Sequence, residues 1–145
     1  MRAVVQRVAS ASVQVGGAAV GSIGRGLCVL VGVTHVDDET SARRMADKLW
    51  NLRIFADSQG RTNVSAADLK LPLLVVSQFT LYADTQRGRR PSFAEAASPE
   101  VAEELIERLV TFLEEKGASV AQGRFGEHME LTLVNDGPFT LVVVT

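Results

Sequence analysis

A serine and a histidine offer one route to catalysis in this chain. Ser77 ends a run of apolar residues, and His128 stands in the sequence Gly126-Glu127-His128-Met129. A histidine within hydrogen-bond reach of a hydroxyl can act as its general base, so the pair could serve a hydrolase of small molecules. Nothing in the sequence orients His128, and His35 is typical of a surface histidine. The chain also lacks a Walker loop, a dinucleotide fingerprint, and HExxH and GxSxG patterns.

Cys28 is the only cysteine, and it lies within the apolar run Leu27–Val31. An internal disulfide is therefore excluded. Burial favours an inert structural thiol over a nucleophile. One cysteine and two histidines do not favour a zinc site. We expect the protein to work without a metal or a cofactor.

The segment Ser77-Gln78-Phe79-Thr80 places polar side chains directly after the apolar residues Leu73–Val76. A buried polar group costs about 1–3 kcal/mol if it has no partner, so these groups need hydrogen bonds or a ligand. Two interpretations stay open on the residues alone. Either the strand passes from the core to the rim and turns these side chains to water, or they line a site.

A second polar segment, Asn135-Asp136-Gly137-Pro138-Phe139-Thr140, lies between two predicted strands. Its asparagine, aspartate, glycine and proline suit a plain hairpin turn. A Gly-Pro peptide bond is cis in only about 5–6% of cases. On composition alone, a hairpin turn is the favoured interpretation.

The composition is ordinary for a globular protein, and 145 residues fit one domain spanning residues 1–145. Apolar runs such as Leu141–Val144 are too short to cross a bilayer, and the first residues show no signal peptide. We therefore expect a cytoplasmic protein without a membrane partner. The net charge of −2 weakens the case for a protein that reads nucleic-acid sequence, yet it permits a local basic patch that grips an RNA end.

Hydrophobic periodicity and turn residues predict many strands and two helices. One helix begins at Asp37-Asp38, and the other runs from Ser98-Pro99 to Lys116-Gly117. Loops are expected over Ala56–Lys70 and Thr85–Ser98. The expected strands are two within Met1–Val15, broken near Ala9-Ser10, followed by Ala18–Ile23, Leu27–Val33, Leu52–Phe55, Leu73–Tyr82, Ala118–Ala121, Arg124–Val134 and Phe139–Val144. These elements predict an α+β fold in which two main helices cover a largely antiparallel sheet or partly closed barrel.

The two polar segments together resemble the paired signature of the D-aminoacyl-tRNA deacylase family, also known as the D-tyrosyl-tRNA deacylases. The resemblance runs the full length of the chain. Its further blocks, in order, are Met1–Val8, Gly21–Leu27, Leu52–Phe55, Asn63–Ser65, Gly88–Phe93 and Gly123–Gly126. So many blocks at the expected spacing make the resemblance highly specific.

The resemblance implies a homodimeric hydrolase that cleaves the ester bond of D-aminoacyl-tRNA, and of glycyl-tRNA, in translation quality control. Ser77, Gln78, Phe79 and Thr80 would form the pocket for the 3′-terminal adenosine and the esterified D-amino acid. Backbone N–H groups near Gln78 and Phe79 would serve as an oxyanion hole. The ribose 2′-hydroxyl of the substrate would help to activate water, and Thr80 as a covalent nucleophile is the rival mechanism.

Chiral proofreading would come from Gly137-Pro138. The resemblance implies that this peptide bond is cis and projects from one subunit into the pocket of the other. Its carbonyls would bind the α-amino group and leave no room for an L side chain. Arg7 would hold the loop in place, and Met129 would stand near the adenosine.

Three arginines, Arg87, Arg89 and Arg90, either contact tRNA phosphates or simply solvate a loop. Two residues depart from the family pattern: Phe139, where valine is commoner, and Glu127, where a small residue is commoner. The alternative function is a non-catalytic tRNA-end-binding module, which would bind tRNA and leave the ester intact.

Overall fold

A computed structural model describes residues 1–145. Its elements, in chain order, are β1 (Arg2–Val15), β2 (Ala18–Ile23), β3 (Gly26–Gly32), α1 (Glu39–Asn51), β4 (Arg53–Ala56), β5 (Thr62–Ser65), α2 (Ala66–Leu69), β6 (Leu73–Ser77), a 3₁₀ helix (Phe79–Tyr82), α3 (Pro99–Glu115), β7 (Val120–Gln122) and β8 (Glu130–Val144). None of the helices is long and apolar enough to cross a membrane.

The main sheet has the strand order β2-β1-β3-β6-β7, and β8 also pairs with β1. The pairs made by β1 are antiparallel, whereas β3–β6 and β6–β7 are parallel. The sheet curls until its two edge strands, β2 and β7, almost meet. Their close approach is seen at Gly21 of β2, where a Cβ would lie only 2.5 Å from the Gln122 carbonyl oxygen of β7. The predicted α+β fold with a partly closed, largely antiparallel barrel is confirmed.

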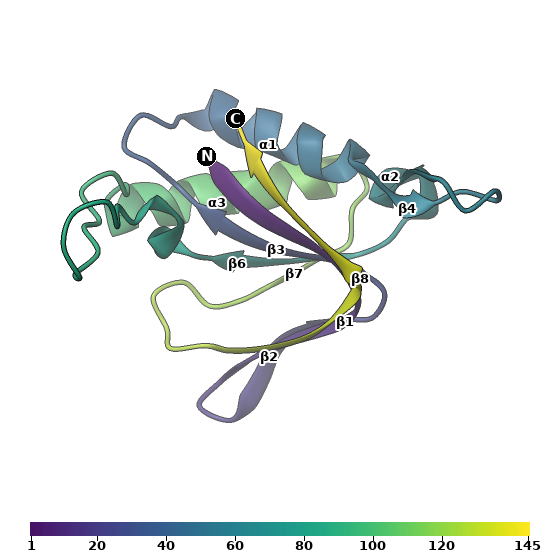
Figure 1. The fold of residues 1–145 in the computed structure, drawn as a ribbon, viewed down its shortest axis with the longest axis horizontal. Coiled ribbons are helices and arrows are strands. Elements are labelled where there is room, and N and C mark those ends of the chain that lie inside the picture. The colour runs from purple at the N-terminus through teal and green to yellow at the C-terminus, as the bar shows by residue number, and fades with distance from the viewer.

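Two long helices, α1 and α3, lie together over one face of this sheet (Figure 1). Each begins where the sequence predicts: Asp38 caps α1 in a reciprocal capping box with Ser41, and Ser98-Pro99 starts α3. Their apolar stripes bury residues such as Leu49 and Leu109 against the strands. A smaller apolar cluster that includes Val13, Cys28 and Leu74 fills the other side of the sheet. As a result, β3 is buried on both faces.

The predicted break near Ala9-Ser10 is wrong, because β1 is one continuous strand. The strand changes partner at this point instead. Residues Arg2–Val8 pair with β3, and residues Ala11–Val15 pair with β2. Small, exposed residues at the change of partner, Ala9 and Ser10, resemble a strand end in the sequence.

Two further predictions are also wrong. The segment Ala56–Lys70 is not all loop, since it contains β5 and α2, which is capped by reciprocal hydrogen bonds between Ser65 and Asp68. The strand expected over Leu73–Tyr82 ends at Ser77, and the chain turns into a 3₁₀ helix. Its partner strand β3 ends at Gly32, so residues beyond Gln78 have no ladder to join.

Gly26 and Gly24 provide a matched test of the barrel packing. A Cβ on Gly26 would lie 2.2 Å from the Pro72 carbonyl oxygen, whereas a Cβ on Gly24 would meet nothing within 4 Å. We expect Gly26→Ala to reduce the free energy of unfolding by about 1–3 kcal/mol, because the backbone must shift. Gly24→Ala should be neutral or slightly stabilising. Urea unfolding of both variants checks this, and equal effects would contradict the packing described.

Candidate functional site

The segment Ser77–Thr80 is held at the end of β6 by contacts from two neighbouring strands. The Gln78 N–H donates to the Val31 carbonyl of β3 at 2.7 Å. From β1, Arg2 donates to the Leu81 carbonyl at 2.6 Å, and its guanidinium lies 4.9 Å from the centre of the Tyr82 ring. The turn that follows Ser77 is therefore fixed to the barrel.

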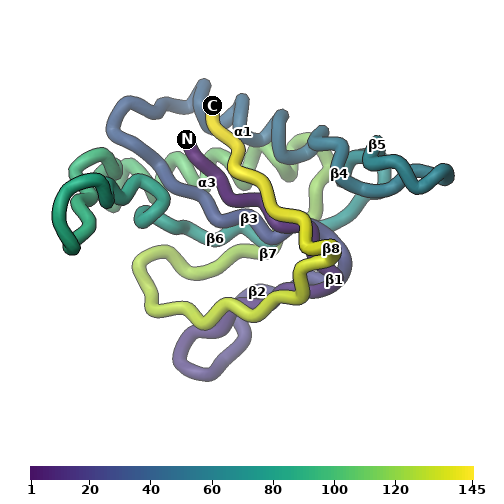
Figure 2. Tube along the Cα trace, in the orientation of Figure 1, coloured from purple at the N-terminus to yellow at the C-terminus, as the bar shows by residue number.

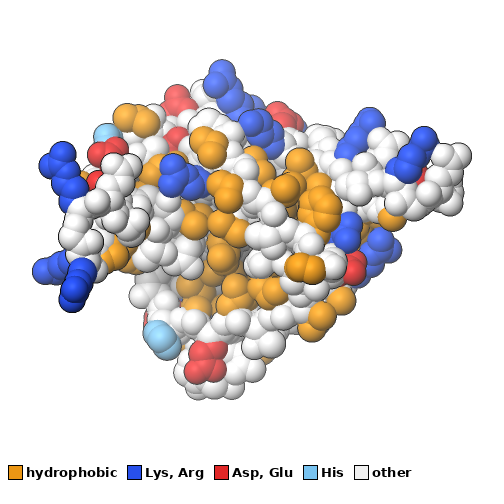
Figure 3. Space-filling model, viewed as in Figure 1, with side chains coloured by type: hydrophobic (Ala, Val, Ile, Leu, Met, Phe, Trp, Pro, Cys, Tyr) orange, Lys and Arg blue, Asp and Glu red, His pale blue; other side chains and the backbone are white.

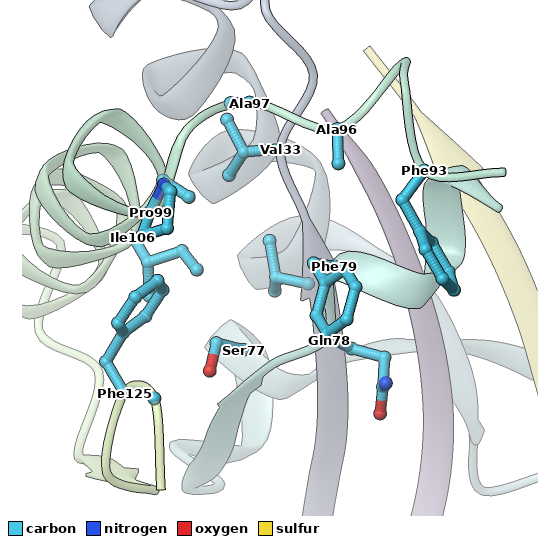
Figure 4. Close-up of a pocket in the computed structure, with 13 residues that line it drawn as sticks. Val33, Ser77, Gln78, Phe79, Phe93, Ala96, Ala97, Pro99, Ile106 and Phe125 are labelled. Atoms are coloured by element: carbon cyan, nitrogen blue, oxygen red, sulfur yellow. The ribbon is translucent and has the colours of Figure 1, made fainter.

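An apolar cavity of about 410 Å³ opens beside this segment. Phe79 and Phe93 form one wall, with their ring centres 5.0 Å apart in an edge-to-face arrangement, and Ile106 and Phe125 form the opposite wall (Figure 4). The Ser77 hydroxyl lies between the two walls, while the Gln78 side chain points away from them. Phe79 is 56% exposed, which is unusual for a large aromatic side chain and typical of a binding surface.

A second cavity, of about 280 Å³, lies beside the same segment. It shares Ser77, Gln78 and Phe79 with the apolar cavity, and Glu127, His128 and Met129 also line it. Met129 packs closely on Gly123, where a Cβ would lie 2.6 Å from its sulfur. The structure therefore brings the predicted site residues Ser77, Gln78, Phe79 and Met129 together.

No activated nucleophile is present among these groups. Ser77 and His128 line one cavity, but no hydrogen bond joins them, and the exposed His128 has no carboxylate that orients it. The Thr80 hydroxyl accepts a hydrogen bond from Gln78 and contacts no base. The Phe79 N–H begins the 3₁₀ helix and has no acceptor within it, whereas the Gln78 N–H is already paired. This arrangement can bind an oxyanion more readily than it can attack a carbonyl.

The second polar segment forms an excursion of β8 instead of the predicted hairpin turn. Along the β1–β8 ladder, Val8 pairs with Asn135 and Gln6 pairs with Thr140, so residues 136–139 of β8 all lie opposite Arg7. The strand continues on both sides of the excursion, because β1 is long enough to pair with both halves. The Gly137-Pro138 peptide bond at the tip is cis.

Arg7 of β1 binds the excursion, residues 136–139, through its side chain. It donates to the Asp136 carbonyl at 3.0 Å and to the Ile54 carbonyl of β4 at 2.6 Å. Its guanidinium also lies 4.8 Å from the centre of the Phe139 ring, a favourable cation–π contact. Arg7 thus contacts Asp136 and Phe139, the residues on either side of Gly137-Pro138.

The excursion and the cavities do not meet within one chain. Neither Gly137 nor Pro138 lines a cavity that Ser77 lines. The bend of β8 lies on the right of the view in Figures 1 and 2, whereas β6 leads into its 3₁₀ helix on the left. A single chain therefore presents the two polar segments apart from each other.

The three arginines of the long loop are exposed at the end of the molecule that carries the apolar cavity. The loop is closed by paired hydrogen bonds between Asp84 and Ser92, and it turns at Gly88. Arg87, Arg89 and Arg90 make no salt bridge. Lys and Arg side chains project from this end of the molecule in Figure 3. The loop thus places free positive charge near the cavity.

Comparison with known proteins decides the family. The family model described as "D-Tyr-tRNA(Tyr) deacylase" matches residues 4–144. The chain is 57% identical over 148 residues to "D-aminoacyl-tRNA deacylase" of Rhodococcus opacus, covering 99% of both proteins. It is also 54% identical over 143 residues to the protein of the same name in Roseiflexus castenholzii, covering 99% of this chain and 91% of that protein. The chain belongs to the D-aminoacyl-tRNA deacylase family.

Solved structures share the fold of this chain. A structure described as "c-Myc DNA Unwinding Element Binding Protein" superposes with a TM-score of 0.93 at 38% identity, covering 100% of this chain and 99% of that chain. Another, of "a probable eukaryotic D-amino acid tRNA deacylase", has a TM-score of 0.85 at 19% identity, covering 98% of this chain and 97% of that chain. At that identity, the second match shows a shared fold.

Several lining residues of this deacylase-family cavity carried no predicted role. Phe93 and Phe125 lie within blocks that resemble the family, but only the structure shows that they face each other across a cavity. Ile106 fits the helix stripe in the sequence, and it indeed borders the core as well as the cavity. An aromatic residue inside a polar, arginine-rich loop is the one signal that could have indicated Phe93.

Cys28 takes no part in the deacylase-family site. The thiol is buried, and burial raises its pKa from 9.0 to about 11. We expect negligible reaction with a thiol reagent at pH 8 until the chain is unfolded in urea. Because the folded chain holds this proton more tightly, the thiol should also lower stability as pH rises from 9 towards 11. Rapid labelling of the native protein would contradict the burial described.

Proposed function

We propose that this protein hydrolyses the ester bond of D-aminoacyl-tRNA and of glycyl-tRNA, releasing the free amino acid and tRNA. The observation that carries this proposal is the apolar cavity beside Ser77–Phe79 in a chain that belongs to the deacylase family. A cavity of about 410 Å³ is within the range of sites that enclose a small ligand.

The terminal adenosine would occupy the cavities around Ser77–Phe79. Bases that have left a helical stack bind to aromatic side chains, and Phe79, Phe93 and Phe125 offer such faces and edges. Met129, in the neighbouring cavity, would contact the same nucleoside. The ester carbonyl then reaches the polar segment where the two cavities join.

Water would be the nucleophile, because no side chain in the site is activated for attack. The Phe79 N–H would donate to the tetrahedral oxyanion, and one such donor is worth about 2.7–4 kcal/mol. The Gln78 N–H already donates to Val31, so Gln78 would contribute by fixing the turn that presents the Phe79 N–H. The ribose 2′-hydroxyl of the substrate would orient the water. The exposed Thr80 hydroxyl lines neither cavity and has no base beside it, so it would serve as the acceptor for the Gln78 side chain.

Chirality would be read by a second copy of the chain. Gly137 and Pro138 have no partner in the β1 ladder, so the excursion is free to project. In a homodimer, its carbonyls would accept hydrogen bonds from the α-ammonium group of the ester in the partner's pocket. A wall of main chain would exclude an L side chain, whereas a D side chain would point elsewhere and glycine has none.

The face crossed by β8 is the surface that we propose for the homodimer. Val134, Val142 and Val144 alternate along β8 and are exposed, and Val142 reaches 66%. Apolar side chains gather on this face in Figure 3. The same strand carries the excursion, so a partner that binds here would receive it. We also propose that residues 1–145 form one domain and that the protein acts in the cytoplasm.

A non-catalytic tRNA-end-binding module is the second candidate. The related structure described as a DNA unwinding element-binding protein favours nucleic-acid binding within this fold. Such a module would bind tRNA with strong salt dependence and leave the ester intact.

Deacylation of matched substrates tests the proposed function. Purified protein should release D-tyrosine from D-tyrosyl-tRNA at least about a hundredfold faster than L-tyrosine from L-tyrosyl-tRNA, a difference worth about 2.7 kcal/mol. His128→Ala should retain this activity, because His128 is neither paired nor oriented. Binding without cleavage would favour the module, and loss of activity in His128→Ala would favour the Ser77–His128 hydrolase.

The loop that carries Arg87, Arg89 and Arg90, here called the arginine loop, predicts that tRNA binding depends on salt concentration. Replacement of Arg87, Arg89 and Arg90 by alanine should weaken tRNA binding and reduce the slope of log K against log salt by about 0.7–0.9 for each phosphate that is no longer neutralised. Arg44→Ala on the exposed face of α1 is the control and should change neither. Filter binding at several salt concentrations measures both. An unchanged slope in the triple variant would show that the loop is merely solvated.

Activity should be sensitive to substitution of Gly137. Its φ is +149°, and a Cβ there would lie 2.8 Å from the Phe139 backbone nitrogen. Gly137→Ala should therefore displace the excursion and slow D-ester cleavage about tenfold or more. The free energy of unfolding should fall by only about 1–3 kcal/mol, because the strain is confined to an exposed segment. Full activity in this variant would argue against any role of the excursion.

A further inference from the structure

Side chains close the base of the β8 excursion where the strand ladder is interrupted. The Asn135 amide nitrogen donates to the Thr140 hydroxyl oxygen at 2.8 Å. The Asn135 amide oxygen accepts the Phe139 N–H at 2.6 Å. From β1, the Gln6 side-chain amide donates to the same Thr140 oxygen at 3.3 Å. The two residues that flank the excursion are thus tied to each other and to the neighbouring strand.

These side-chain hydrogen bonds stand in for the backbone pairing that is absent across the excursion. Residues 136–139 lie between the last ladder pair on one side, Val8 with Asn135, and the first on the other, Gln6 with Thr140. Arg7 holds the entry to the excursion through the Asp136 carbonyl. At the exit, the Phe139 N–H would have no acceptor without the Asn135 oxygen. Arg7 and Asn135 therefore restrain opposite ends of the same short segment.

We propose that Asn135 and Thr140 are positioning residues for chiral discrimination, a role that rests on the proposed function. They fix the height of Gly137-Pro138 above the strand and so set the ratio of D- to L-ester cleavage. Neither side chain would touch the reacting atoms. The main chain excludes an L side chain only if it cannot move by about the width of a methyl group. Loss of the hydrogen bonds made by Asn135 and Thr140, which we call the clamp, should therefore mainly raise the rate of L-ester cleavage.

The Thr140 hydroxyl gives the sharpest pair of variants. Thr140→Val keeps the shape of the side chain but removes the acceptor for both Asn135 and Gln6, whereas Thr140→Ser keeps that acceptor. We expect the D-to-L ratio of deacylation rates to fall about tenfold in Thr140→Val and to stay near the wild-type value in Thr140→Ser. Matched D- and L-tyrosyl-tRNA are the substrates.

Asn135 gives a second, independent pair. Asn135→Ala removes both hydrogen bonds, and the D-to-L ratio should again fall about tenfold. Asn135→Asp should rescue it, because one carboxylate oxygen can accept the Phe139 N–H while the other accepts a hydrogen bond from the Thr140 hydroxyl. Thermal unfolding of all four variants separates positioning from folding, since a merely structural role would lower D- and L-ester rates together with the melting temperature.

The outcomes divide cleanly. A lower ratio in Thr140→Val and Asn135→Ala, with recovery in Thr140→Ser and Asn135→Asp, supports the clamp. An unchanged ratio in both disruptive variants, or rates that fall in parallel for the two esters, overturns it. Failure of the wild-type protein to cleave D-tyrosyl-tRNA would instead reject the proposed function itself, so the two failures are distinguishable.

Discussion

The antiparallel pairing of β1 with β8 is the constraint on which the rest of the structure depends. β1 is long enough to pair with β3 near its start and with β2 near its end, while β8 runs along its other edge throughout. This length allows the ladder to be interrupted at Arg7 without ending the strand. Four residues of β8 can therefore leave the sheet and return to it in register, which a two-residue hairpin turn could not do.

The same sheet positions the pocket at Ser77–Phe79 through the ends of two parallel strands. β3 and β6 are parallel, and both end at the same edge of the sheet. Ser77 is the last residue of β6, and the N–H of Gln78 makes the final bond to β3. Because β3 stops at Gly32, the chain turns there into a short helix and exposes Phe79 beside the apolar cavity. Strand length, more than any single polar side chain, decides where the pocket opens.

Much of this arrangement could be predicted from the sequence. The helix starts near Asp38 and Ser98 and the strand over Leu27–Val33 follow from capping and periodicity. The polar segments at residues 77–80 and 135–140 were also visible. Local patterns failed where tertiary pairing decides the outcome. Composition favours a turn over residues 135–140, and only the long partner strand β1 makes β8 continuous there.

The cavity itself could not be predicted, since its walls come from β3, the 3₁₀ helix, the arginine loop, α3 and the loop before β8. The hydrogen bonds of Arg7 and Asn135 could not be predicted from the sequence either, although the resemblance implied that Arg7 holds the loop around Gly137-Pro138. The pocket and the excursion lie apart from each other within one chain. Under the proposed function, the two features cooperate between copies of the chain, and symmetry would then give each dimer two composite sites.

Mixing of two inactive variants tests this cooperation most directly. Gly137→Ala damages the excursion and Phe79→Ala damages the pocket, so each homodimer should cleave D-tyrosyl-tRNA poorly. After subunit exchange, a mixed dimer holds one intact pocket facing one intact excursion, and an equal mixture should recover roughly a quarter of wild-type activity. No recovery, despite mixed dimers verified by native mass spectrometry, would contradict a site shared between subunits.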